Sequence, residues 1–73
     1  MRVIISSHSK RRLKEIRQYG VDVADVREAA SKIPGKIPKA TRFRGFITGT
    51  GKMFDLVAKD LPAGRLIITI IGK

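Results

Sequence analysis

His8 and Arg12 are the two residues of this chain whose types and spacing are best suited to chemistry. If the segment around them is helical, they lie one turn apart on the same face. A histidine can exchange a proton near neutral pH, and an arginine can hold two phosphate oxygens with paired N–H groups. Metal-free RNA cleavage needs both, because a 2′-hydroxyl loses its proton and the phosphorane that forms is negatively charged. Arg44, in a predicted strand, can add a second positive charge, so the predicted catalytic residues are His8, Arg12 and Arg44.

The segment that carries this pair, residues 7–19, sorts into three stripes when it is drawn as a helix. The stripes are apolar (Ser9, Leu13, Ile16), basic (Lys10, Lys14, Arg17) and, between these two, a boundary stripe (His8, Arg12, Glu15, Tyr19). A boundary stripe is shaped by the core and remains open to a ligand. The structural alternative is that His8 bonds to backbone at the start of the helix while Arg12 lies extended along the surface.

Positive charge is the strongest global feature of the chain. Sixteen Lys and Arg face six Asp and Glu, which gives a net charge of +10, and twelve of the sixteen lie within residues 1–44. This excess favours a polyanionic partner, with nucleic acid ahead of an anionic membrane or an acidic protein. The alternative is a charged surface that serves only solubility. The predicted nucleic-acid-binding residues are Lys10, Arg11, Lys14, Arg17, Lys36, Lys39 and Arg42.

Several other kinds of site have little support in the sequence. There are no cysteines and a single histidine, so neither a metal site nor any cofactor is expected. Gly49-Thr50-Gly51-Lys52 lacks the spacing of a phosphate-binding loop and is better explained as a hairpin turn. Neither a signal peptide nor a membrane-spanning run of about 18 apolar residues is found, which favours a cytoplasmic protein.

The order of predicted elements is β-α-α-β-β-β within one domain, residues 1–73. A β-branched strand over residues 2–6 precedes the first helix, which Ser7 is expected to cap and Gly20 to end. Asp22 caps a second helix that ends before Pro34, with Val23, Val26, Ala29, Ala30 and Ile33 on its buried face. A basic connector, residues 34–39, leads to strands at 42–48, 53–59 and 65–71.

These elements predict an α+β fold in which two helices pack on one face of a small, mostly antiparallel sheet. The first strand is expected to pair at an edge, and strand 65–71, apolar on both sides, to be central and covered. Phe54, Leu56 and Ala58 alternate along their strand and are expected on one face. Arg42 and Arg44 would lie on the other, open face. Phe43 and Tyr19 could stack a base there, or lie at the edge of the core.

His8-Ser9-Lys10-Arg11-Arg12, Gly20-Val21 and the closing strand 66–71 together resemble a group of small bacterial and archaeal proteins. These begin with a strand and a His-x-x-x-Arg helix, and the group is similar to the RelE-like (barnase–EndoU–colicin–RelE) toxin superfamily. The resemblance covers nearly the whole chain as an order of elements. It implies a single RelE-like domain with His8 and Arg12 in the site and Thr69 facing it. The chain departs from the pattern in a longer spacing from His8 to Gly20, and Lys73 ends the sequence without the C-terminal Tyr, His or Arg common in RelE-like toxins.

The sequence therefore predicts a small basic RNA-directed protein, with metal-free, toxin-type endoribonuclease action on RNA or ribosome-bound mRNA as its enzymatic form. One alternative is a nucleic-acid-binding module without catalysis, which would use the basic helix and the connector. Another is a protein-partner module whose basic face meets an acidic antitoxin. A small acidic protein encoded by the neighbouring gene would favour a toxin pair.

Overall fold

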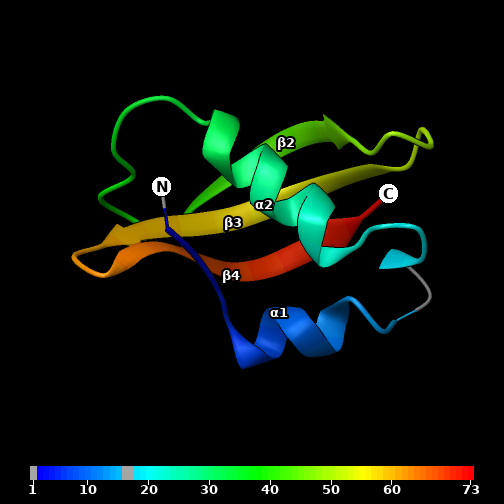
Figure 1. Ribbon diagram of the computed structural model, residues 1–73, viewed down its shortest axis with the longest axis horizontal. Coiled ribbons are helices and arrows are strands. Elements are labelled where there is room, and N and C mark those ends of the chain that lie inside the picture. Colours follow the sequence, from blue (N-terminus) through cyan, green and yellow to red (C-terminus); the bar gives the residue numbers. More distant parts are fainter. Residues whose placement is uncertain (1, 16–17) are drawn as a thin grey trace.

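The predicted order of elements is confirmed by a computed structural model, which describes residues 2–15 and 18–73. The elements are β1 (Val3–Ile5), α1 (Ser7–Arg12), α2 (Val23–Lys32), β2 (Thr41–Ile47), β3 (Met53–Leu61) and β4 (Gly64–Gly72). The fold is α+β, with two helices and a four-stranded mixed sheet. Figure 1 shows α2 crossing one face of this sheet while α1 lies beside β4.

The strands lie in the order β1-β4-β3-β2, so the N-terminal strand is an edge strand as predicted. β2, β3 and β4 form an antiparallel meander, and β1 pairs parallel to β4 over three residues, with Ile5 opposite Ile67. The turn after β2 is the predicted hairpin: the Thr48 N–H donates to Lys52 O at 2.9 Å, and Gly51 has a φ of 91°. β4 is therefore internal, with the first and third strands on its two sides.

The core lies between α2 and the face of the sheet that α2 covers. Phe54, Leu56 and Ala58 share that face and are fully buried, as their alternation predicts. The remaining buried apolar residues are Val3, Ile5, Val21, Val26, Ala29, Ala30, Ile33, Ile37, Ile67 and Ile70. On the other face, Leu66, Thr69 and Ile71 of β4 are only partly buried. The expectation that β4 is covered on both sides is therefore wrong.

The second helix follows its sequence signals closely. Asp22 accepts from the Asp25 N–H at 2.9 Å, and the Asp25 carboxylate accepts from the Asp22 N–H at 3.0 Å, which together make a capping box. Val23 is an exception, since it is exposed at the first helical position instead of joining the buried face. The N-terminal turn reaches past the core, so only the later turns bury apolar side chains.

The first helix differs from its prediction in both position and length. Ser6, not Ser7, is the N-cap, because Ser6 Oγ accepts from the Ser9 N–H at 3.0 Å. The helix ends at Arg12, and Leu13 is its C-cap. The helix prediction for Ile16 and Arg17 lies outside the described residues. α1 also does not share the face covered by α2, since it runs along the edge of β4 (Figure 1).

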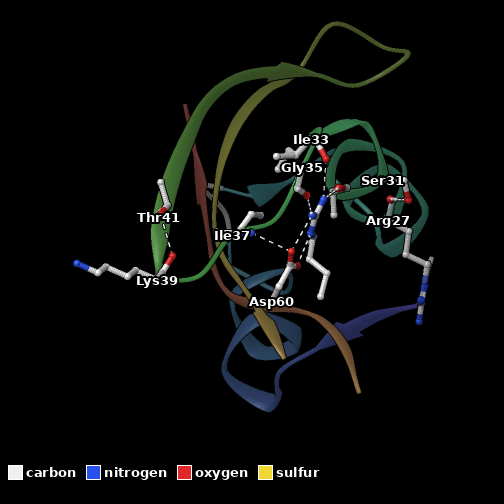
Figure 2. A network of polar contacts seen from close by, with 10 residues as sticks. Arg27, Ser31, Ile33, Gly35, Ile37, Lys39, Thr41 and Asp60 are labelled. Carbon is white, nitrogen blue, oxygen red and sulfur yellow. Dashed lines mark hydrogen bonds and ion pairs between the residues drawn. The ribbon is translucent and has the colours of Figure 1, made fainter. Parts of the chain in front are cut away.

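A buried arginine fixes the connector between α2 and β2. Arg65 is 2% exposed, and all five of its N–H donors are used. Two N–H groups donate to the Asp60 carboxylate at 2.7 and 3.0 Å. The other three donate, each at 2.8 Å, to the carbonyl oxygens of Ala30, Ile33 and Gly35. Asp60 also accepts from the Ile37 N–H at 2.9 Å, as Figure 2 shows, so this ion pair ties the end of α2 to the start of β4.

Candidate functional site

The site begins where β1 stops pairing with β4. From Ile67 onward, the edge carbonyls of β4 accept hydrogen bonds from side chains instead of from a neighbouring strand. The donors are Ser6, Ser9, Arg12 and Gln18. Ser9 Oγ donates to Ile67 O at 3.0 Å, and Ser6 Oγ donates to Ile68 O at 3.2 Å. The Arg12 Nε–H and the Gln18 amide both donate to Ile70 O at 3.2 Å. These contacts hold α1 against the edge and fix which of its faces meets the sheet.

His8 and Thr69 meet at this edge. His8 Nε2 lies 3.1 Å from Thr69 Oγ1, in an exposed contact between residues at opposite ends of the chain. Ser9 is completely buried one position further along the helix, so the backbone that carries His8 is firmly held. The ring of His8 is therefore oriented by a hydroxyl and remains open to solvent. Thr69 is the residue that the resemblance predicted to face the site.

Arg12 lies on the same helix, one turn after His8. Its Nη1 pairs with the Glu15 carboxylate at 3.1 Å, while its Nε holds Ile70 O. The side chains of this ion pair are 27% and 50% exposed, respectively. Arg12 is thus anchored to the sheet through Nε, and its Nη1 pairs with a carboxylate that solvent can reach. A phosphate could replace Glu15 here without disturbing the Ile70 contact.

Arg44 is not brought to this pair. It lies on β2, at the opposite edge of the sheet, with β3 and β4 between it and α1. The pairing of β2 with β3 is irregular between Phe43 and Phe46, so Arg44 lies within a bulge. Two strand spacings amount to about 10 Å, before the distance from β4 to α1 is added. The expectation that Arg44 reaches the His8 stripe fails because it assumed a different place for α1.

The predicted basic surface is divided among separate parts of the molecule. Lys10 and Arg11 are exposed on α1, and Lys14 is exposed in the turn that follows it. Lys36 and Lys39 are exposed on the connector. The connector is joined to the end of β3 because the Asp60 N–H donates to Ile37 O. Arg17 lies outside the described residues. Figure 1 shows α1 beside β4 and the connector leading from α2 to β2, so these basic residues lie on separate segments of the fold.

The two aromatic candidates for base stacking have different surroundings. Tyr19 is 82% exposed and contributes nothing to the core, although the sequence placed it on the boundary stripe. Phe43 packs against the core as a partly buried residue. Of these two, only Tyr19 has an open ring.

Asp55 is a buried carboxylate that the sequence pattern did not predict as part of a site. Its side chain has no solvent exposure and accepts from Arg42 at 2.7 and 3.0 Å, from the Gly45 N–H at 3.1 Å and from Lys73 at 3.3 Å. Burial alone would raise the pKa of Asp55, but the hydrogen bonds from Arg42, Gly45 and Lys73 outweigh it and hold the pKa below its usual value. An acidic residue inside an apolar strand was the available signal. Arg42 is therefore an ion-paired residue, not a freely solvated one.

Two surface hollows lie away from His8 and Arg12. One, of about 440 Å³, is between α2 and the β2–β3 hairpin, and its lining includes Glu28 and Phe46. The other, of about 700 Å³, lies beside the connector and is lined in part by Lys36 and Arg65. Neither His8 nor Arg12 lines either of these two hollows.

No protein-family model, curated protein or solved structure matches this chain, so the comparisons assign it neither to a family nor to a fold group. Within the part of the chain that the structure describes, the helices are too short and too polar to cross a membrane.

Proposed function

We propose that this chain is a small RNA-directed protein of RelE-like architecture that acts as a metal-free endoribonuclease. His8 accepts the proton of a 2′-hydroxyl, and Arg12 stabilises the negative charge that develops on the non-bridging oxygens of the phosphorane. The 2′-oxygen then bonds to phosphorus as the bond to the 5′-oxygen breaks. The leaving 5′-oxygen takes a proton from water, and the imidazolium of His8 returns its proton to solvent, so the products are a 2′,3′-cyclic phosphate and a 5′-hydroxyl.

The observation that carries this proposal is the exposed contact of 3.1 Å between His8 Nε2 and Thr69 Oγ1. A hydroxyl bonded to one ring nitrogen fixes the plane of the imidazole and leaves the other nitrogen for substrate. Arg12 lies one turn away with an exposed counter-ion that a phosphate can displace. The net charge of +10 attracts a polyanion to this surface.

The element order offers a second support. The β-α-α-β-β-β order of elements is the one that the RelE-like resemblance implies. The same resemblance names His8, Arg12 and Thr69 as site residues, and these come from α1 and β4. An acidic protein partner, of the antitoxin kind, would fit the same basic surface.

The test is cleavage of RNA and of ribosome-bound mRNA by the purified protein beside His8→Ala. We expect the wild type to cleave and His8→Ala to be slower by a factor of about 100 or more, the usual effect of losing a general base. Lys32→Ala is the matched control, because Lys32 is an exposed cation on α2, away from the site. Absence of cleavage by the wild type, or equal cleavage by His8→Ala, ends the catalytic proposal.

A non-catalytic nucleic-acid-binding module is the second candidate. It is favoured by Lys10 and Arg11, which are exposed on α1, and by Lys14, which is exposed in the turn after it. In that case affinity falls linearly with the logarithm of salt concentration, is insensitive to His8→Ala and drops when Lys10 and Lys14 are both replaced by Gln. An affinity that does not respond to salt would exclude it.

A further inference from the structure

One face of the sheet has no helix over it among the residues that the structure describes. α2 packs on the face that carries Phe54, Leu56 and Ala58, and α1 lies at the edge (Figure 1). Residues that alternate with these point the other way. This uncovered face is built from the following residues: Ile4 beside Leu66, Val57 beside Thr69 and Arg42, Asp55 beside Ile71, and Lys59 beside Leu66.

A single row of side chains crosses this face from α1 to β2. His8 contacts Thr69, Thr69 lies opposite Val57, and Val57 lies opposite Arg42. Residues that are directly opposite in neighbouring strands share a face, and two strand spacings place Arg42 about 10 Å from Thr69 along the row. Arg42 is therefore the cation that faces His8 across the open sheet, the position that the sequence had given to Arg44.

The Arg42 guanidinium is oriented before any ligand arrives. Its Nε and Nη2 both donate to Oδ2 of Asp55, at 3.0 and 2.7 Å. Nη1 makes no hydrogen bond to the residues that the structure describes, and the side chain is 40% exposed. Asp55 receives further bonds from Gly45 and Lys73, so the cluster of Arg42, Asp55 and Lys73 keeps a net charge of +1.

We propose that Arg42, oriented by the buried Asp55 carboxylate, is the second phosphate-binding residue of this site, so that an RNA strand held by His8 and Arg12 crosses the uncovered sheet face over Thr69 and Val57. This inference rests on the proposed function. Arg42 binds a neighbouring phosphate of the same strand, and Asp55 is a positioning residue. The strand is single, because attack by a 2′-hydroxyl in line with the leaving oxygen needs a backbone free to leave the A-form helix.

Other features of the face fit this occupant better than they fit a second copy of the chain. Lys59 lies beside Leu66 on the same face and adds another cation. Two copies that each carry a charge of +10 would repel one another across such a surface. The phenylalanines Phe43, Phe46 and Phe54 pack in or against the core, so the bases meet aliphatic side chains and recognition depends on phosphate contacts.

The test is equilibrium binding of a fluorescent single-stranded oligoribonucleotide that carries 2′-O-methyl groups throughout, so that it cannot be cleaved. We expect Arg42→Gln to weaken binding about tenfold or more, the usual effect of losing a charge-assisted hydrogen bond. The slope of log affinity against log salt should fall by about 0.7, as for one phosphate of a single strand. Lys32→Gln removes the same charge from α2, behind the sheet, and should have only a small effect.

Asp55→Asn separates positioning from net charge. It makes the protein more positive, so a purely electrostatic surface would bind RNA more tightly, whereas loss of the Arg42 orientation weakens binding. Arg42→Lys tests the same point without touching the buried residue: it keeps the charge and the salt slope but loses the geometry of the guanidinium, so binding should weaken severalfold.

The inference is overturned if Arg42→Gln binds the oligonucleotide as tightly as the wild type, or if only Arg44→Gln loses affinity. The proposed function survives either result if cleavage that depends on His8 persists. Equal losses from Arg42→Gln and Lys32→Gln also overturn it, because they would reflect overall charge alone. Unchanged binding by Arg42→Lys and tighter binding by Asp55→Asn would exclude the positioning role. A wild type that does not bind the oligonucleotide and does not cleave RNA excludes both proposals together.

Discussion

Replacing Arg65 by Met should remove a large part of the stability of the fold. The substitution keeps an apolar stem of similar length and deletes all five N–H donors. Asp60 is 23% exposed at its side chain and can recover water, and Gly35 is exposed. The carbonyl oxygens of Ala30 and Ile33 belong to buried residues, and each loses a bond of 2.8 Å.

The magnitude follows from these losses. A buried polar group left without its partner costs about 1–3 kcal/mol, and removing one member of a buried ion pair costs about 3–5 kcal/mol in all. A chain of 73 residues is expected to have a total unfolding free energy of about 4–11 kcal/mol. Arg65→Met should therefore leave the protein marginally stable at 25 °C.

The assay is urea unfolding followed by circular dichroism, with linear extrapolation to water. Lys39→Met is the matched control, because Lys39 is exposed on the same connector and should change stability by less than about 0.5 kcal/mol. Asp60→Asn should lie between the two, since it keeps one acceptor oxygen. If Arg65→Met unfolds within about 1 kcal/mol of the wild type, the network does not hold the connector as argued.

Two further outcomes follow from the same structure. The hydrogen bonds from Arg65, and then from Ile37, lower the pKa of Asp60 from 3.8 to about 2. A carboxylate whose pKa is lower in the folded state stabilises the fold at pH values above its pKa in the unfolded chain. This stability should therefore be lost as the pH falls from about 4 to 2, and the Tm should fall with it. A Tm that stays constant over this range would contradict the prediction. Gly64→Ala should cost about 1–3 kcal/mol or more, since φ there is 146° and a Cβ would lie 2.6 Å from Arg2 O, while Gly49→Ala, with open space around it, should be nearly neutral in the same denaturation assay.

Local signals predicted the parts of the fold that depend on local physics. The Asp22 cap, the hairpin turn before Met53 and the alternation of Phe54 and Leu56 each involve neighbours in sequence, and each is confirmed. Such local signals determine where an element begins and which of its sides is apolar. The order of elements could therefore be predicted from these signals.

The differences arise where distant parts of the chain compete with local pattern. The stripe through residues 7–19 fits a long helix, yet α1 ends at Arg12, and the unpaired carbonyl of Ile70 takes bonds from both Arg12 and Gln18. The Ile70 carbonyl is open to these side chains because β1 is short and pairs with β4 only as far as Ile67. The periodicity of residues 7–19 carries no information about the length of that pairing. The place of Arg44 likewise depends on sheet order and on a bulge.

The contact between His8 and Thr69 has a consequence for synthesis. The strands β2, β3 and β4 pair with near neighbours, whereas β1 must close a loop of about 60 residues to reach β4, and such distant contacts form late. No partial chain that lacks residue 69 can contain the site. A nascent chain still being translated therefore carries His8 apart from Thr69, and the contact between them forms only when β4 has been made and the N-terminal segment has docked on it.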